Sequence, residues 1–328
     1  MKPLIAIDGD IVRYRCGFAA QHTFYNIWMK DDCEPDGEAG EWSTKSSATA
    51  PVMTFNDAKT ANKWLKEQTE YKPEDIVRIP RIKVEPLKNA LYSLRLVMEN
   101  IQAKYPDGEL RFYGSCPTPE NWRYEIYPEY KANRPDRQPF WAPQIKEYVE
   151  RKYGIIAEAP YEADDLIAMA AHECREVGRD CVIVTIDKDM DQIPGVHYNW
   201  VTDEEYSVSD VDALRNLLRQ SITGDSTDNI KGIPGWGAKA ANEWLKGCST
   251  DSPVLDAYRE SGEWKDPTEA EYHALLNTAL VTLPTTQDQM EFLKLGVQYA
   301  AKAVDAKPSQ EHEAVGEETG PETRGAGG

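Results

Sequence analysis

The sequence has little of what marks several large classes of protein. Its six cysteines form no Cys-x-x-Cys pair and no spacing suited to zinc, so we expect free thiols rather than a zinc site or a disulfide framework. No stretch approaches the roughly 18 apolar residues of a membrane span. The apolar run at the N-terminus is too short for a secretory signal. These features predict a cytoplasmic protein without a membrane partner.

Histidine and positive charge are also scarce. The five histidines are scattered and none has an acid–base partner at motif distance, so none is assigned a catalytic role. The net charge is −19 and the sequence pI about 4.8, which taken alone argues against nucleic acid, because phosphate binders are usually basic. Carboxylates that hold divalent metals are neutralised when the metal is bound, however, and an acidic tail need not touch the substrate. The charge therefore excludes little.

Apolar strands and amphipathic helices alternate along the chain. Apolar runs at 3–7, 110–113 and 181–186 predict buried strands, and residues spaced by three or four predict a helix over 85–105. Further helices are expected at 143–153 and 162–177. This order predicts an α/β fold with a mostly parallel sheet flanked by helices. After about residue 200 the pattern changes to helices joined by a glycine-rich hairpin.

These patterns divide the chain into three parts. Residues 1–200 form the expected α/β core, interrupted by a polar surface insertion near 21–85. Residues 201–306 form a helical subdomain. Residues 307–328 have almost no large apolar side chain and are expected to be a disordered acidic tail.

Acidic residues collect where the predicted strands end. Asp8 and Asp187 each follow an apolar strand, and the carboxyl ends of parallel strands meet at one edge of a sheet. Carboxylates that converge there repel one another unless a cation joins them. Oxygen ligands select Mg²⁺ or Mn²⁺, and two such ions about 4 Å apart can support phosphodiester hydrolysis. The other acidic residues in these clusters are Glu162, Asp164, Asp165, Asp189 and Asp191, of which Asp165 and Asp191 could equally be helix caps or turn residues.

Two further segments could bind phosphate. Tyr130, Lys131 and Arg134, with Arg123 and Arg137 nearby, make a phosphate clamp plausible beside a metal cluster. The segment 224–229, which contains Asp225 and Asp228, leads into a hairpin. In that hairpin the backbone N–H groups around Gly232, Gly235 and Gly237, together with Lys239, could hold a backbone phosphate. Trp236, in the same turn, is a candidate for contact with DNA.

Taken in order, these motifs resemble the 5′-nuclease family. Asp8 after a strand, Tyr130–Arg134, Glu162–Asp165, 185–189 and 224–237 occur in the order seen in flap endonucleases, the 5′-nuclease domain of bacterial DNA polymerase I and phage 5′→3′ exonucleases. The phage branch looks closest, and the similarity covers about residues 2–245. It implies a PIN-like core followed by a helix–three-turn–helix. For a phage protein it implies the host cytosol.

The resemblance also implies an activity and its residues. The enzyme would be a metal-dependent 5′→3′ exonuclease or flap endonuclease in DNA replication or repair, cutting duplex with 5′ ends, nicks or flaps, and also RNA primers, to leave 5′-phosphates. Lys131 and Arg134 match catalytic basic residues, Arg15 matches an arginine after the first aspartate, and the hairpin matches an element that grips DNA and holds a potassium ion. The implied ligands are Asp8, Glu162, Asp164 and nearby Asp165 for the first metal, and Asp187, Asp189, Asp225 and Asp228 for the second.

The chain departs from the family in two places. Relatives usually carry another aspartate at the end of the strand matching 110–113, where this chain has Gly114-Ser115. The stretch between Arg134 and Glu162 is short, which favours attack from an end over threading of a flap.

Two alternatives stay open. A DNA-structure binder with an impaired site would explain the missing aspartate. A haloacid-dehalogenase-like phosphatase would use Asp8 as nucleophile, since 8–12 fits that motif and 187–191 fits its acidic motif.

Overall fold

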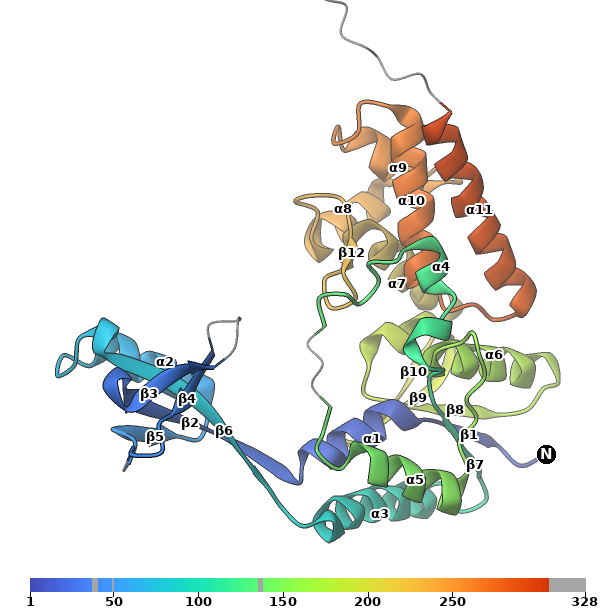
Figure 1. Cartoon of the computed structure of the whole chain (residues 1–328). Helices are drawn as coiled ribbons and strands as arrows, with labels where there is room; N and C mark the ends of the chain where they lie inside the picture. The colour runs from blue at the N-terminus through green and yellow to red at the C-terminus, as the bar shows by residue number, and fades with distance from the viewer. Residues whose placement is uncertain (37–40, 49, 135–137, 307–328) are drawn as a thin grey trace, which may run out of the picture.

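The computed structural model describes residues 1–36, 41–48, 50–134 and 138–306. The centre of the body is a five-stranded sheet in the order β10-β9-β8-β1-β7 (Figure 1). β1 pairs in parallel with β7 and β8, β8 pairs in parallel with β9, and β10 runs antiparallel to β9. The predicted α/β class with a mostly parallel sheet is confirmed. The strands are β1 (Leu4–Asp8), β7 (Glu109–Tyr113), β8 (Cys181–Val184), β9 (Gly195–Asn199) and β10 (Glu204–Val208).

Helices cover both faces of this sheet, and β1 is buried on both sides, as its continuous apolar run predicts. Ile5 and Ile7 face a cluster with α1, α3 and α5. Leu4 and Ala6 face the opposite cluster, to which α6 supplies more buried side chains than any other element. The helices predicted at 85–105, 143–153 and 162–177 correspond to α3, α5 and α6. Their bounds are α1 (Gly9–Phe18), α3 (Leu87–Lys104), α5 (Ala142–Tyr153) and α6 (Ala163–Glu176).

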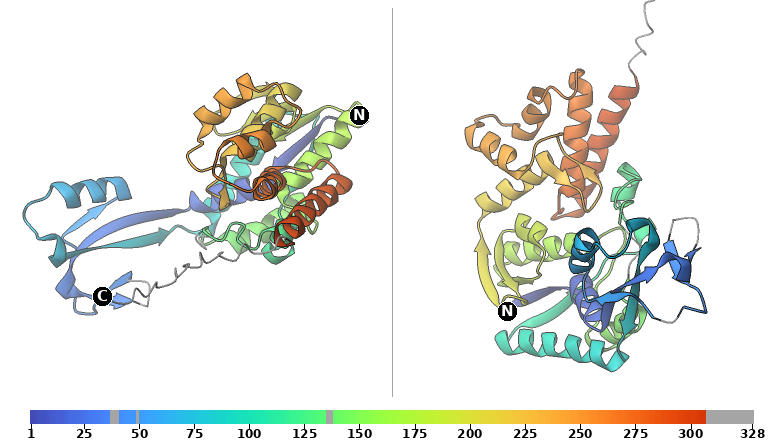
Figure 2. Two further views of the ribbon diagram at one scale, coloured as in Figure 1. Left: turned by 90° about the horizontal axis from the view of Figure 1, so that it is seen from above. Right: turned by 90° about the vertical axis from the view of Figure 1, so that its left-hand side faces the viewer.

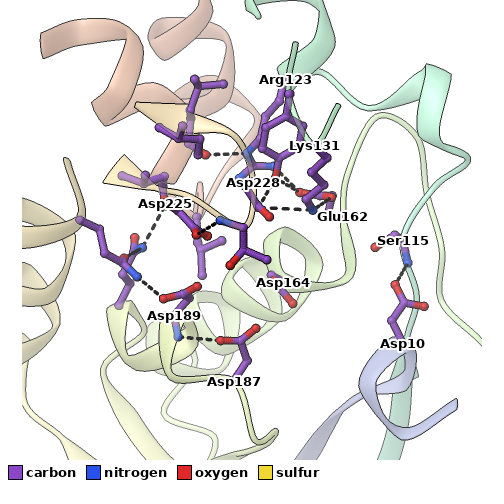
Figure 3. A pocket seen from close by; sticks show the side chains of 18 of the residues that line it. Asp10, Ser115, Arg123, Lys131, Glu162, Asp164, Asp187, Asp189, Asp225 and Asp228 are labelled. Carbon is purple, nitrogen blue, oxygen red and sulfur yellow. Dashed lines mark hydrogen bonds and ion pairs between the residues drawn. The ribbon is translucent and has the colours of Figure 1, made fainter. Parts of the chain in front are cut away.

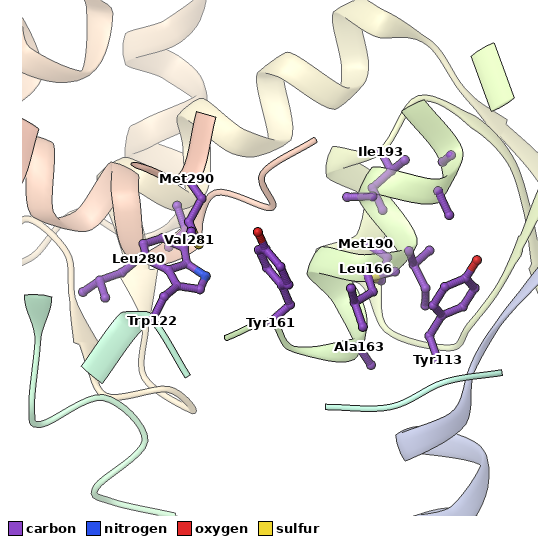
Figure 4. Packing of buried hydrophobic residues seen from close by; sticks show 14 of the residues in the cluster. Tyr113, Trp122, Tyr161, Ala163, Leu166, Met190, Ile193, Leu280, Val281 and Met290 are labelled. Atoms are coloured by element: carbon purple, nitrogen blue, oxygen red, sulfur yellow. The ribbon is translucent and has the colours of Figure 1, made fainter. Parts of the chain in front are cut away.

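The core on the α6 side continues into the C-terminal helices. Leu280, Val281 and Met290 pack in the same cluster as Trp122 and Tyr161 (Figure 4). The two parts of the molecule therefore share buried surface rather than meeting through a linker. The C-terminal elements are α7 (Asp210–Thr223), β11 (Gly224–Asp225), β12 (Ile230–Lys231), α8 (Ala238–Gly247), α9 (Pro253–Glu260), α10 (Pro267–Val281) and α11 (Gln287–Asp305).

The boundary expected at residue 200 falls inside the sheet. β10 pairs with β9 through Val208, so the body extends past that residue before α7 begins the helical part. Short elements connect the rest of the body. They are α4 (Arg123–Ile126) and the 3₁₀ turns η3 (Thr118–Glu120) and η4 (Lys188–Gln192).

The insertion expected near 21–85 forms a β-rich arm that projects from the body (Figures 1 and 2). Its long strands β2 and β6 are antiparallel, with Gln21 opposite Val84. Trp28, Cys33 and Ile79 form a small core of its own. Its elements are β2 (Gln21–Met29), η1 (Lys30–Asp32), β3 (Cys33–Asp36), β4 (Glu41–Thr44), β5 (Met53–Phe55), α2 (Ala58–Glu67), η2 (Pro73–Asp75) and β6 (Ile76–Val84).

Among the described residues, no helix is long and apolar enough to cross a bilayer. The tail expected at 307–328 lies outside the described residues.

Candidate active site

A cavity of about 340 Å³ lies at the carboxyl ends of the parallel strands, beside the helical subdomain (Figure 3). β1 ends in Asp8 and η4 begins just after β8, so the sheet brings these two acidic segments together. α6 begins at the same place, and the loop between β11 and β12 adds residues from the helical side. The charged residues that line the cavity are Asp8, Asp10, Arg123, Lys131, Arg134, Glu162, Asp164, Asp187, Asp189, Asp225 and Asp228.

Asp8 is held where the strand turns into helix α1. Its Oδ1 accepts a hydrogen bond from Ile11 N (3.1 Å), which caps the helix, and its Oδ2 accepts from Thr185 Oγ1 (3.0 Å). The side chain is 2% exposed. Burial raises the pKa of Asp8 to about 7.

The acidic residues on the sheet side repel one another. Burial, and then the charges of Asp8, Glu162 and Asp187, raise the pKa of Asp164 well above its usual value. Burial and Asp187 raise the pKa of Asp189 to about 6. All the potential ligands here are carboxylate oxygens, and their negative charges are not balanced by nearby cations. Such a set of ligands attracts a hard divalent cation.

Glu162, at the start of α6, is in the opposite situation. Its Oε1 accepts from Lys131 Nζ at 2.5 Å, and its Oε2 accepts from Tyr130 Oη at 2.8 Å and from Arg123 Nη1 at 3.2 Å. Burial alone would raise the pKa of Glu162, but Lys131 and Arg123 outweigh it and hold the pKa at about 2. This carboxylate is charged and already surrounded by donors.

Asp228 is held in the same way from the helical side. Arg134 Nη2 forms an ion pair with its Oδ1, and Lys131 Nζ lies 3.6 Å from its Oδ2. The Tyr130 hydroxyl is 3.0 Å from that Oδ2, so it can donate its single proton either to Asp228 or to Glu162. The backbone of Lys131, with φ of 57°, is fixed by a bond from its N–H to Asp228 O (2.9 Å). The predicted phosphate clamp therefore reaches the predicted metal ligands directly.

Asp165 and Arg123 form a buried ion pair, and Asp165 also closes the capping box of α6, which is the helix-cap role that the sequence left open for it. Arg123 donates bidentately to Asp165, with both distances 2.8 Å, and each side chain is 2% exposed or less. Its remaining N–H groups reach Glu162, Leu280 O (2.9 Å) and Thr282 O (2.9 Å), so all five donors are used. Arg123 cannot contact DNA from this position, and Asp165 has no free oxygen to offer a metal.

The residues expected to grip DNA lie outside the cavity, except for those of the clamp. Trp236 is half-buried and packs against Trp244, with ring centroids 5.8 Å apart. Lys239 is exposed near the start of α8. Arg15 is exposed on α1, 5.7 Å from the centroid of the Trp200 ring. Arg137 lies outside the described residues.

The turn around Gly232 is exceptionally close-packed. A Cβ at Gly232 would lie 2.1 Å from Thr223 C, whereas at Gly235 and Gly237 no heavy atom lies within 4 Å of the Cβ position. Gly235 has a φ of +78°. Gly232 is therefore required by the approach of two backbones, and Gly235 by its own conformation.

Sequence reasoning missed three polar residues of the site, Asp10, Gln192 and Gln220. Asp10 accepts from Ser115 N (3.0 Å) and pairs with Arg13, and a Cβ at Gly114 would lie 3.7 Å from its Oδ1. Gln220 donates to Asp189 and accepts from Gln192. Asp10 had a usable signal, because it lies two residues after Asp8 at a strand end. The two glutamines had none, since their roles depend on contacts between α7 and η4.

In the described part of the chain, no three Asp, Glu, His or Cys side chains converge closely enough to enclose a metal ion. Figure 3 shows why: Glu162 and Asp228 lie with Lys131, whereas Asp187 and Asp189 lie on the other side of Asp164. The residues fit divalent metal in kind and in location, and their side chains are spread between two groups.

Comparisons with known proteins show which proteins the chain is similar to. A family model described as the 5′-3′ exonuclease, N-terminal resolvase-like domain matches residues 84–217. DNA polymerase I of Rhizobium leguminosarum is 34% identical over 148 residues, which is 39% of this chain and 14% of the relative. The exodeoxyribonuclease of Enterobacteria phage T3 is 34% identical over 126 residues, which is 37% of this chain and 42% of the relative. Flap endonuclease Xni of Shewanella piezotolerans is 32% identical over 138 residues, which is 38% of this chain and 54% of the relative.

The chain spans less than two thirds of each of these relatives. Among solved structures, the T5 D15 protein crystallised with metal ions has a TM-score of 0.47 and 20% identity, covering 64% of this chain and 92% of that one. A T5 D15 flap endonuclease complex with DNA and metal ions has a TM-score of 0.48 and 20% identity, covering 64% and 90%. Residues 84–217 of the chain are therefore similar to the N-terminal resolvase-like domain of 5′-3′ exonucleases.

Proposed function

We propose that this protein is a divalent-metal-dependent 5′→3′ exonuclease and structure-specific endonuclease that hydrolyses DNA phosphodiesters to 5′-phosphate products. The observation that carries the proposal is that Lys131 and Arg134 line the same cavity as the acidic cluster. A phosphodiester is an anion, so a site that cleaves it needs cations where the phosphate lies and carboxylates where metals bind. The match of residues 84–217 to the N-terminal resolvase-like domain of 5′-3′ exonucleases supports the same reaction.

The proposed metals are two Mg²⁺ or Mn²⁺ ions. Asp8, Glu162 and Asp164 would hold the first, and Asp187, Asp189, Asp225 and Asp228 the second. When bound, such ions activate water and stabilise the oxygen that leaves. Burial, and then the charges of neighbouring carboxylates, raise the pKa of Asp8 and of Asp164, and this supports the assignment because a divalent cation would offset both effects.

The basic residues would act on the substrate. Lys131 and Arg134 would hold the phosphate as charge develops on it, and Tyr130 would keep both of them aligned from beneath. The turn from Gly232 to Lys239 would bind the duplex backbone through N–H groups at the start of α8, where a potassium ion would also fit the family pattern. Arg15 and Trp236 are secondary candidates for contact. We further propose that RNA primers are cleaved at the same site.

The test is a digest of 5′-labelled duplex, nicked and flapped DNA with Mg²⁺, with an RNA–DNA hybrid in parallel. We expect 5′-mononucleotides and short oligonucleotides, and no products in EDTA. Asp8→Asn and Asp187→Asn should abolish hydrolysis while leaving DNA binding within a few-fold, because these carboxylates position ions rather than substrate. DNA binding without Mg²⁺-dependent turnover of any substrate would support the impaired DNA-structure binder instead.

A further inference from the structure

The acidic residues of the cavity fall into two groups that differ in their counterions. Among the described residues, Asp8, Asp164 and Asp187 have no Lys or Arg nitrogen within the 4.0 Å of an ion pair, whereas Glu162 and Asp228 do. Lys131 reaches both, at 2.5 Å from Glu162 and 3.6 Å from Asp228, and Arg134 reaches Asp228. Two carboxylates assigned to metals are thus neutralised by the two side chains assigned to phosphate.

Lys131 and Arg134 cannot serve both partners fully. The ammonium group of Lys131 has three donors, which point to whichever oxygens surround it. The planar guanidinium of Arg134 can form a bidentate pair with only one partner at a time. Both side chains can still move, because Lys131 is 21% exposed and Arg134 is 46% exposed. Arg123, which is 2% exposed with every donor used, cannot. The contact of Arg123 with Glu162 is therefore fixed, whereas the contacts of Lys131 and Arg134 with Glu162 and Asp228 can be exchanged for others.

We propose that Lys131 and Arg134 couple metal binding to phosphate binding by exchanging partners. Paired with Glu162 and Asp228, they compete with a divalent cation for those oxygens. Paired with a DNA phosphate, they release the oxygens to the cation. This inference rests on the proposed function, and it requires by linkage that metal and DNA each strengthen the binding of the other.

The decisive measurement needs no catalysis. Mn²⁺ alone is titrated into the full-length protein and into Lys131→Met and Arg134→Met at pH 7.5, by calorimetry and by the spectroscopic signal of free Mn²⁺. Each variant should bind Mn²⁺ more tightly than the wild type, by roughly 2- to 5-fold, the size expected for removing one partly exposed ion pair. Lys146→Met is the matched control, because it removes the same charge from a surface ion pair with Glu150 on α5, outside the cavity, and it should leave the affinity unchanged.

The second arm measures the coupling itself. Ca²⁺ is titrated with and without saturating 5′-phosphorylated hairpin DNA, and a gel checks that the DNA stays intact. DNA should tighten Ca²⁺ binding in the wild type more than in Lys131→Met or Arg134→Met. If DNA tightened Ca²⁺ binding only through general electrostatic attraction, the effect would be the same in the wild type and in both variants.

The outcomes separate this inference from the proposed function. If the wild type binds Mn²⁺ and cleaves DNA, but both variants bind Mn²⁺ as the wild type does or more weakly, the partner exchange is wrong and the nuclease assignment stands. If the wild type binds no divalent cation, both are wrong. Thermal unfolding of each variant confirms that the comparison is made on folded protein.

Discussion

The role of Arg123 follows from contacts with residues far away in sequence. Its guanidinium joins Asp165 at the start of α6 to the carbonyls of Leu280 and Thr282 at the end of α10. Breaking a buried ion pair leaves an uncompensated charge in the interior. We therefore expect Asp165→Asn and Arg123→Met each to lower the free energy of unfolding by about 3–5 kcal/mol.

Denaturant titration measures this loss. Arg175→Ala is the control, because Arg175 pairs with Asp210 on the surface, at 52% and 73% exposure, and such pairs contribute about 0–1 kcal/mol. If Asp165→Asn cost no more than Arg175→Ala, the structural role of the buried pair would be refuted.

His197 should make stability depend on pH. It is fully buried, its Nε2 is 2.8 Å from Ile193 O, and its Nδ1 has no partner among the described residues. Burial lowers the pKa of His197, because a second proton would be placed on that unpartnered nitrogen. The unfolded chain then binds the proton more readily, so this contribution to stability is full above the ordinary histidine pKa of about 6.5 and is lost as the pH falls below it.

The measurement is the free energy of unfolding at pH 7.5 and at pH 5.5, for the wild type and for His197→Gln. Glutamine can keep the bond to Ile193 O and does not titrate. We expect the wild type to lose more stability on acidification than the variant does, and equal losses would contradict the prediction.

At the residue scale, the sequence located the cavity better than it assigned individual roles. Asp8 and Asp187 could be placed because each ends an apolar strand, and strand ends meet at one edge of a parallel sheet. The sequence left the role of Asp165 open between metal ligand and helix cap, because it is adjacent to Asp164 in the first turn of one helix. What separates them is Arg123, whose position depends on α10, more than a hundred residues away in sequence.

At the scale of elements, the close approach of β11 and β12 to the end of α7 leaves room only for glycine at position 232. A Cβ at Gly232 would collide with backbone atoms of Thr223, which cannot rotate away. Gly232→Ala should therefore cost about 3 kcal/mol or more. Gly235→Ala meets open space but a strained φ of +78°, so about 1 kcal/mol is expected.

Gly247→Ala is the matched control, because its Cβ also meets open space, at the end of α8, and alanine is a better helix former. Its effect should be neutral or slightly stabilising. Thermal unfolding of the three variants gives the order, and a Gly232→Ala protein as stable as Gly247→Ala would mean that the two backbones are not in contact.

The sequence predicted the elements that show a clear apolar pattern within their own residues. The helix expected at 85–105 is α3, and Leu94, Met98 and Ile101 are buried in it as their spacing required. The strands of the arm were not foreseen, because a stretch rich in polar residues shows no alternation from which pairing can be inferred. β9 and β10 were also missed. They follow β8 with short connections, and their place in the sheet comes from pairing rather than from local composition.

At the scale of the whole molecule, the arm is a separable unit. The buried cluster of α1, α3 and α5 contains no described residue between Gln21 and Val84, and the arm has its own core. Gln21 and Val84 are directly opposite each other, so a two-residue Asn-Gly turn can replace residues 22–83. We expect the shortened protein to fold cooperatively and to retain Mn²⁺ binding.

Circular dichroism, thermal unfolding and the Mn²⁺ titration test this. Retention of cleavage on simple duplex ends, with a changed preference among nicked and flapped substrates, would place the role of the arm in substrate choice. Loss of the folded state would show that the arm supports the body after all.

The antiparallel stem of the arm also has a kinetic consequence. β1 must pair with β7 across the whole insertion, yet Glu85 N donates to Ala20 O at 2.8 Å, so the two ends of the insertion meet once β2 and β6 pair. Closing that gap lowers the entropic cost of joining β1 to β7 by about 1 kcal/mol, because the loop between the two strands shrinks from roughly 100 residues to roughly 36. An arm that forms early therefore shortens the loop that must close before β1 and β7 can pair. Weakening it with Ile79→Ala should therefore slow refolding of the distant sheet in stopped-flow experiments, while deleting the arm and joining its ends should not.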